Sequence, residues 1–459
     1  MHWKHIARFG ASALLLSGIC PGASTASHSK VAAPVSRGQL IDAVKEKNTK
    51  AIESLLAAHA DVNAPQPDGS TPLAWAVYLN EADAVTRLIK AGANVNTADQ
   101  YGETPLTLAC GTGNTALIET LLTAGADANA ARWNGETALM IASRAGTVPG
   151  VQALLDHGAK PDAVDSSRGQ NALMWAAAES HSDVVDVLIK SGANAKIASK
   201  TGFTPLLFAA QRGDVKSVAS LLAAGLDPNY KLPNGTSTLQ ATVLSGKTEA
   251  AEALLNAGAN PNVADTSGLT PLHVAAQTGD LGLTKLLLEK HADANVRTEK
   301  FDPPARGAGQ FRPAGEQTPL LMAARYNQEP VMRALIAAGA DPKLKAQDGT
   351  TLLMAAASSG HIEAVKYAYE LDPDVNAVTA RKSTVVHAAV TGSMLTSTQP
   401  EICKVIQFLA EKGADLDAVD ARGRTPITVA NILPIDNAVT LMTKLIEASG
   451  KTPKQSPKR

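Results

Sequence analysis

The sequence predicts an all-α repeat solenoid, a curved stack of about twelve helix-turn-helix repeats with β-hairpin fingers. Three observations lead to this prediction. A string centred on Thr-Pro-Leu recurs along the 459-residue chain, most often at a spacing of 33 residues. Each copy is followed by short apolar stripes with helical spacing. Aromatic residues make up only 3% of the chain although hydrophobic residues make up 45%, so alanine has to fill the contacts between closely stacked helices.

The predicted architecture is thus a curved stack of short helix pairs, with a β-hairpin finger leading into each pair. Copies two to twelve share a small polar residue at one position, directly before the start of a helix. Extra residues interrupt the regular spacing in two insertions, 298–317 and 391–400. The shared position is held by Thr71, Thr104, Thr137, Asn171, Thr204, Ser237, Thr270, Thr318, Thr351, Thr384 and Thr425, and Gly38 anchors a degenerate first copy.

The third copy shows why each unit folds as a helix pair. Gly102 can adopt the positive φ of a hairpin turn. Thr104 can cap the first helix with its hydroxyl, and Pro105 can occupy the first helical position, where its missing N–H costs nothing. Gly113 ends this helix, and the second helix carries an apolar face that includes Leu121. One unit is too small to bury this face alone, so neighbouring units form a continuous core.

The eighth copy, residues 270–276, reads Thr-Pro-Leu-His-Val-Ala-Ala. This string and the 33-residue period resemble the ankyrin repeat family. The resemblance covers residues 38 to about 448. It implies an interaction protein without enzymatic activity, whose binding face comprises the hairpin tips and the exposed ends of the first helices.

Residues 1–26 have the features of a secretory signal peptide. Lys4 and Arg8 precede an apolar stretch at 9–19, and Ser24-Thr25-Ala26 supplies small residues for cleavage after Ala26. We therefore expect a bacterial protein that is exported to the periplasm or secreted.

The repeat map sets the remaining boundaries. We expect a linker at 27–37, the solenoid at 38–448 and a disordered basic tail at 449–459. After cleavage only Cys110 and Cys403 remain, eight copies apart. That separation is far beyond the reach of a disulfide, so packing alone has to stabilise the stack.

No group of residues has the spacing of a catalytic, cofactor or metal site. The chain has ten histidines, but no pair has the i, i+4 spacing of a metal-binding helix, and there is no CxxC motif. By the family resemblance, His273 and His387 hold a structural position. Cys110 falls on an alanine position and is expected to be buried and inert. We therefore predict no enzymatic activity, no cofactor and no metal.

Charge and hydropathy exclude two further partner classes. The formal net charge is −1, which gives no case for binding a nucleic acid through a basic face. No apolar run reaches about 18 residues, so no membrane span is expected. We expect a monomer whose partner is a protein of unknown identity.

Aromatic and arginine side chains, which dominate binding hot spots, gather at the positions of the expected binding face. Those in copies two to six lead us to place the principal contact there. The 298–317 insertion adds two phenylalanines. Trp75, Trp175 and Phe208 fall on a packing position and are expected in the core. The candidate contact residues are Tyr78, Tyr101, Arg132, Trp133, Arg144, Phe203, Gln211, Arg212, Arg325, Tyr326, Phe301 and Phe311.

The leading functional hypothesis is therefore an exported scaffold that binds a protein partner on its concave face. Two alternatives stay open at this stage. One is an enzyme or ligand-binding protein that uses the 298–317 insertion, and the other is a purely structural spacer. The surface aromatics can also be isolated side chains without a partner.

Overall fold

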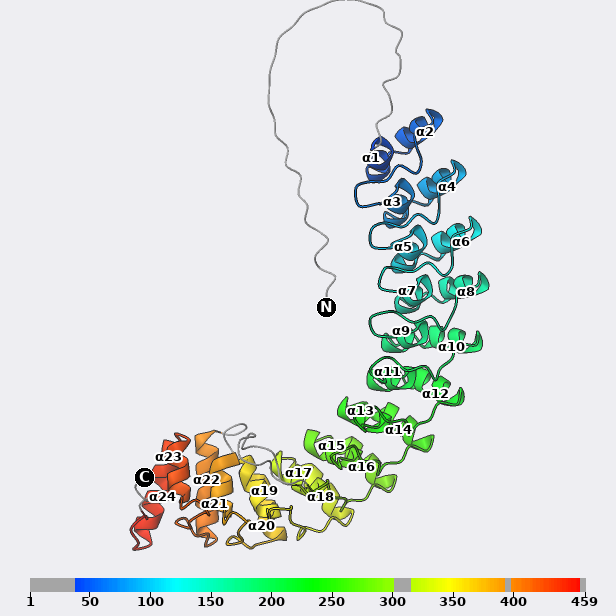
Figure 1. Ribbon diagram of the computed structural model, residues 1–459. Helices are drawn as coiled ribbons and strands as arrows, with labels where there is room; N and C mark the ends of the chain where they lie inside the picture. The colour runs from blue at the N-terminus through cyan, green and yellow to red at the C-terminus, as the bar shows by residue number, and fades with distance from the viewer. Residues whose placement is uncertain (1–37, 301–314, 393–397, 455–459) are drawn as a thin grey trace, which may run out of the picture.

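The computed structural model describes residues 38–300, 315–392 and 398–454, and these ranges contain 24 helices. The helices follow one another as twelve pairs, which we number as repeats 1 to 12 (Figure 1). We call the loop that leads into the odd-numbered helix of a repeat the finger of that repeat. The predicted all-α solenoid is confirmed. Within the described ranges the fingers contain no strand, only two isolated antiparallel bridges, Ala131 with Thr137 and Lys231 with Ser237.

The first helix of each repeat is short, and the second is longer by one or more residues. The odd-numbered helices are α1 (Gln39–Lys45), α3 (Pro72–Tyr78), α5 (Pro105–Thr112), α7 (Ala138–Ala145), α9 (Ala172–Ala178), α11 (Pro205–Arg212), α13 (Thr238–Leu244), α15 (Pro271–Thr278), α17 (Pro319–Arg325), α19 (Leu352–Ser359), α21 (Val385–Gly392) and α23 (Pro426–Ile432). The even-numbered helices are α2 (Thr49–Ala57), α4 (Ala82–Lys90), α6 (Thr115–Thr123), α8 (Val148–Asp156), α10 (Ser182–Lys190), α12 (Val215–Ala223), α14 (Thr248–Asn256), α16 (Leu281–Glu289), α18 (Glu329–Ala337), α20 (Ile362–Leu371), α22 (Gln399–Glu411) and α24 (Asp436–Ala448).

Local sequence signals set the helix ends as predicted. In α5 the Thr104 hydroxyl accepts a hydrogen bond from the Thr107 N–H, at 3.2 Å, and Pro105 stands in the first turn. Gly113 ends the helix in the left-handed conformation, with a φ of 70°. Gly102 has a φ of 79°, and a Cβ there would lie only 2.8 Å from the backbone of the next finger, so the turn requires glycine.

The stack forms an arc (Figure 1). From α1 to α20 the odd-numbered helices line the inner side of the arc, and the even-numbered helices line the outer side. Odd-numbered helices contact odd-numbered neighbours, and even-numbered helices contact even-numbered ones. Leu106, Ala109 and Leu121 are fully buried between them, and the core continues from repeat 1 to repeat 12. The small alanine side chains allow this close approach of neighbouring helices.

The fingers are joined to one another by backbone hydrogen bonds. The Trp133 N–H, for example, donates to the Tyr101 carbonyl at 3.1 Å. Pro233 has no N–H, so finger 7 is joined differently: the Tyr230 hydroxyl donates to the Gly202 carbonyl at 2.9 Å. The other backbone donors in this finger ladder are Gln100, Ser166, Lys200, Glu299, Gln347, Ala380 and Ala421.

A second ladder, made by asparagine side chains, links the loops that follow the even-numbered helices. Asn129 is typical: its amide donates to the Gly158 carbonyl at 3.1 Å, and its oxygen accepts from the Lys160 N–H at 2.9 Å. Each such residue therefore satisfies two backbone groups of the next repeat. Lys196 and Lys343 hold this position at two joints of the stack and make no such bridge. The bridging residues are Asn63, Asn96, Asn129, Asn229, Asn262, Asn295 and Asn376.

Hydrogen bonds join the two ends of the larger insertion. The Thr298 N–H donates to the Gln317 carbonyl at 3.0 Å, and the Gln317 N–H donates to the Thr298 hydroxyl at 2.9 Å. Thr298 and Gln317 thus form the neck of finger 9. The smaller insertion is partly helical, because α22 begins at Gln399.

Several predictions fall on residues outside the described ranges. They are the signal peptide at 1–26, the linker at 27–37, and Phe301 and Phe311. Of the tail predicted at 449–459, residues 455–459 also lie outside, whereas the Lys454 N–H donates to the Asp417 carboxylate at 3.1 Å.

Candidate functional site

Three exposed aromatic side chains stand out on the surface formed by the odd-numbered helices and the fingers, which we call the inner face. Tyr78 at the end of α3 is 56% exposed, Tyr101 on finger 3 is 56% exposed, and Trp133 on finger 4 is 77% exposed. The backbone hydrogen bond from Trp133 to Tyr101 places the last two side by side on neighbouring fingers. Large apolar side chains this exposed bury little surface within their own chain and are available to a partner.

Arg132, next to Trp133, links fingers 3 and 4 through two ion pairs. Its side chain lies between Glu103 at 2.5 Å and Glu136 at 2.8 Å and is only 13% exposed. Burial acts to lower the pKa of Arg132, but the two carboxylates outweigh burial and hold the pKa above its usual value. Arg132 therefore fixes the position of fingers 3 and 4, and its charge is already paired within the chain.

Arg144 and Trp175 form a stacked pair between repeats 4 and 5. The guanidinium lies over the indole ring, 4.7 Å from its centroid. Burial lowers the pKa of Arg144. The same arrangement recurs between repeats 1 and 2, where the Lys45 ammonium lies 4.1 Å from the Trp75 ring centroid. In each case a cation at the end of one odd-numbered helix covers the tryptophan of the next.

The two tryptophans differ in how their indole N–H groups are satisfied. The Trp75 Nε1–H donates to Ser70 at 3.1 Å and to Gln66 at 3.2 Å. The buried Trp175 Nε1–H has no hydrogen-bond partner among the described residues. Trp75 also meets the exposed Tyr78 edge-on, with 5.7 Å between ring centroids.

The prediction that Trp75, Trp175 and Phe208 belong to the core is only partly right. Each packs against the core with one side and stays partly exposed on the inner face. The reason is geometric, because a short odd-numbered helix cannot cover a large ring that lies between it and the finger. Phe203 is half-buried against Phe208, with 5.4 Å between ring centroids.

The other predicted contact residues are spread along the arc. Gln211 is half-buried and Arg212 exposed at the end of α11. Arg325 and Tyr326 lie in repeat 9, away from the aromatic group of repeats 2 to 6. Burial lowers the pKa of Arg325, which makes no ion pair within the described residues, and Tyr326 is 40% exposed.

Sequence reasoning missed two exposed apolar residues at the same register as Tyr78. Leu244 ends α13 and is 66% exposed, and Ile432 ends α23 and is 62% exposed. Their position relative to the repeated Thr was the available signal, but the search was restricted to aromatic and arginine side chains.

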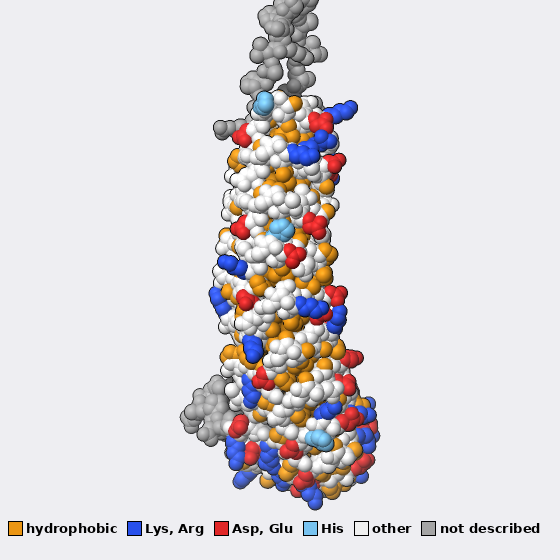
Figure 2. Space-filling view, turned by 90° about the vertical axis from the view of Figure 1, so that its right-hand side faces the viewer, with side chains coloured by type: hydrophobic (Ala, Val, Ile, Leu, Met, Phe, Trp, Pro, Cys, Tyr) orange, Lys and Arg blue, Asp and Glu red, His pale blue; other side chains and the backbone are white. Residues whose placement is uncertain are grey.

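Among the residues that the structure describes, the even-numbered helices carry no comparable group of exposed aromatic side chains. In Figure 2, which looks onto the outer side of the arc, hydrophobic side chains form narrow bands among polar ones, and positive and negative charges are mixed. No helix among the described residues is long and apolar enough to cross a membrane.

His273 and Cys110 are buried titratable groups with structural roles. The His273 imidazole bridges the Thr270 hydroxyl and the Gln317 carbonyl, both at 3.0 Å, and burial lowers its pKa to about 4. Burial raises the pKa of the Cys110 thiol, which disfavours the reactive thiolate. In the described part of the chain no three His, Cys, Asp or Glu side chains form a group that could hold a metal ion.

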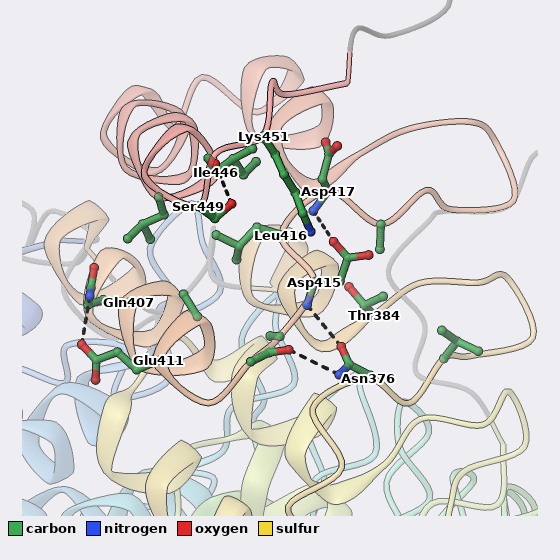
Figure 3. Close-up of a pocket in the computed structure, with 16 residues that line it drawn as sticks. Asn376, Thr384, Gln407, Glu411, Asp415, Leu416, Asp417, Ile446, Ser449 and Lys451 are labelled. Atoms are coloured by element: carbon green, nitrogen blue, oxygen red, sulfur yellow. Dashed lines mark hydrogen bonds between the residues drawn. The ribbon is translucent and has the colours of Figure 1, made fainter.

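A hollow of about 780 Å³ lies beside the last two repeats (Figure 3). Asn376 and Asp417 line it, and both serve in the stacking of the loops. The Asn376 oxygen accepts from the Asp415 N–H at 3.2 Å, and the Asp417 carboxylate holds Lys454. These contacts indicate a structural role for the polar groups of the hollow.

The chain matches a known family model and is similar to a solved structure. A family model described as "Ankyrin repeats (3 copies)" matches residues 40–132, 111–200, 139–232, 206–298 and 320–420. Among solved structures, the crystal structure of the human ASB11 ankyrin repeat domain is similar, with a TM-score of 0.45 and 25% sequence identity. The alignment covers 49% of this chain and 99% of that one. No curated protein sequence matches the chain.

Proposed function

Because the chain belongs to the ankyrin repeat family, we propose that it is a non-enzymatic scaffold that binds a protein partner on the inner face of repeats 2 to 6. Ankyrin repeats generally mediate protein–protein interactions. The observation that carries the proposal is the exposed group of Tyr78, Tyr101 and Trp133 on a rigid support.

The support matters because binding is weakened by the cost of ordering flexible groups. Here the fingers that carry Tyr101 and Trp133 are joined by their backbones and braced by the Arg132 ion pairs. Tyr78 is held against Trp75. The aromatic rings are thus presented in fixed positions before a partner arrives, as expected of binding hot spots.

The test is a pull-down from the native envelope or medium with three forms of the protein. The first is the mature chain and the second carries Tyr78→Ala, Tyr101→Ala and Trp133→Ala. The third is a control with Val215→Ala, Val378→Ala and Val419→Ala, which removes exposed apolar side chains from other parts of the surface. We expect a partner that is retained by the mature chain and by the control, and a loss of roughly 30-fold or more in affinity in the aromatic variant.

Two outcomes would contradict this assignment. Equal retention by all three forms would move the contact to another surface, and deletion of residues 301–314 between the ends of the closed neck would then test the insertion. Absence of any retained protein would favour the structural spacer.

We also propose that the protein is exported, on the basis of the signal-peptide features of residues 1–26. N-terminal sequencing of the protein purified from its source should place the first residue at Ser27. A mature N-terminus at Met1 would contradict export by this segment.

A further inference from the structure

The turn of finger 11 contains a residue that its backbone conformation disfavours. Lys382 has a φ of 55°, in the left-handed region, and Glu316 in finger 9 is the other such exception among the fingers of repeats 2 to 12. Residues other than glycine are strained in this conformation. Glycine holds the equivalent turn position, with positive φ, in Gly69, Gly102, Gly135, Gly169, Gly202, Gly235, Gly268, Gly349 and Gly423.

Lys382 lies in a group of exposed cations that have no partner among the described residues. Arg381 precedes it, and Arg422 occupies the tip of finger 12; all three side chains are exposed. The Ala421 N–H donates to the Arg381 carbonyl at 2.8 Å, so the two fingertips are neighbours. None of the three side chains makes an ion pair or a hydrogen bond within the described residues. We call Arg381, Lys382 and Arg422 the basic fingertips.

The acidic side chains of fingers 10 and 12 have other hydrogen-bond partners. Asp348 on finger 10 accepts from the Thr350 N–H at 3.0 Å and from its hydroxyl at 2.7 Å. Asp420 accepts from the Arg424 side chain at 3.0 and 2.8 Å. None of the described acidic side chains forms an ion pair with the basic fingertips, so their positive charge is available to a partner.

We infer that the basic fingertips bind an acidic segment of a protein partner, at a surface separate from the inner face of repeats 2 to 6. A strained lysine where glycine would fit better indicates that the charge is retained for a function. An acidic protein segment suits the small size of the group, which spans two fingers. A nucleic acid requires a longer basic stripe on a chain that is basic overall, whereas Lys and Arg here number 42 against 43 Asp and Glu.

The substitution Lys382→Gly separates binding from folding. It relieves the strained turn, so the thermal midpoint should rise, and it removes a cation, so binding should weaken. We expect the full chain to bind a labelled oligoglutamate peptide with an affinity that falls with salt, and Lys382→Gly to weaken it roughly threefold to tenfold. Arg422→Ala should have a similar effect on binding without raising the midpoint.

Glu316→Gly is the control, because it relieves the same strain at the other exceptional turn but removes a negative charge. The ion pairs that it removes, with Arg297 and Lys300 at 3.5 Å, lie near the surface and contribute little to stability. Its midpoint should rise while peptide binding is kept. Absence of peptide binding by the full chain, or equal binding by Lys382→Gly, would overturn the inference. Tighter binding of single-stranded DNA that is lost in the same variants would overturn it in favour of a nucleic acid.

Discussion

Repeats 2 to 6 and repeats 8 to 12 share one packing scheme but present different chemistry to solvent. Leu106 in repeat 3 and Val386 in repeat 11 occupy equivalent positions and are both fully buried. At the fingertips, by contrast, Tyr101 in repeat 3 corresponds to Arg381 in repeat 11. The buried positions fix the stack, so the exposed positions are free to differ and to carry separate binding properties.

The two regions also differ at one buried polar position. Thr107 fills it in repeat 3, whereas His273 and His387 fill it in repeats 8 and 11. The imidazoles join neighbouring repeats, because His387 contacts the Arg424 carbonyl at 3.0 Å as His273 contacts Gln317. Burial lowers the pKa of both histidines, and that of His273 falls to about 4.

The largest expected effect is therefore a loss of stability in acid that begins in repeats 8 to 12. A histidine in the unfolded chain titrates near 6.5, so between pH 6.5 and about 4 the unfolded chain binds more protons than the folded one. The contribution of His273 is fully present above pH 6.5 and falls by up to about 3 kcal/mol as the pH drops through this window.

Hydrogen exchange followed by mass spectrometry, near neutral pH and near the lower end of that window, measures this effect segment by segment. Amides of repeats 8 to 12 should lose protection first, and His273→Gln should reduce the difference between the two regions. Equal loss of protection in repeats 2 to 6 would contradict the prediction. The pKa values of Asp68 and Asp165 lie below the usual value, so their contributions are lost only at lower pH.

Much of this architecture was predictable, because the repeated string contains the residues that begin and end each helix. Thr104, Pro105 and Gly113 do in the structure what their chemistry predicts. The asparagine ladder was also visible as a recurrence, at Asn63, Asn96 and other equivalent positions, although its partners in the next repeat were not.

The candidate site was less predictable, because exposure and pairing depend on how repeats meet. Arg132 looked like a free contact residue, yet two carboxylates from different fingers enclose it. Trp175 looked like a core residue, yet only the structure shows that Arg144 covers a ring that the helix leaves half-exposed. Such pairings join different repeats, and the period alone does not specify them.

A smaller effect is expected from breaking the asparagine ladder in repeats 2 to 6. Asn129→Ala removes two hydrogen bonds to the next repeat and should lower the free energy of unfolding by about 1 kcal/mol. Urea unfolding followed by circular dichroism measures the change. Lys196→Ala is the matched control, because Lys196 holds the same position without a bridge, and it should leave the stability unchanged. Equal effects of the two substitutions would show that the ladder contributes nothing.

The smallest expected effect is a gain from completing the ladder where it is interrupted. Lys196 already has the local turn of a bridging residue, since its N–H bonds to the Asn194 side chain at 3.0 Å. Gly225 and Asp227 stand where Gly158 and Lys160 stand relative to Asn129, so Lys196→Asn should stabilise the chain by about 0.5 kcal/mol.

The same substitution at Lys343 provides the contrast between the two regions. There the following helix α20 ends at Leu371 and continues into Asp372 with an extended backbone, whereas the helix before Gly225 ends in the usual turn. Asparagine at 343 would therefore find no backbone carbonyl in the position that the ladder requires. Lys343→Asn should not stabilise the chain. A gain at 343 equal to that at 196, measured by urea unfolding, would show that the effect comes from removing a lysine and not from a bridge between repeats.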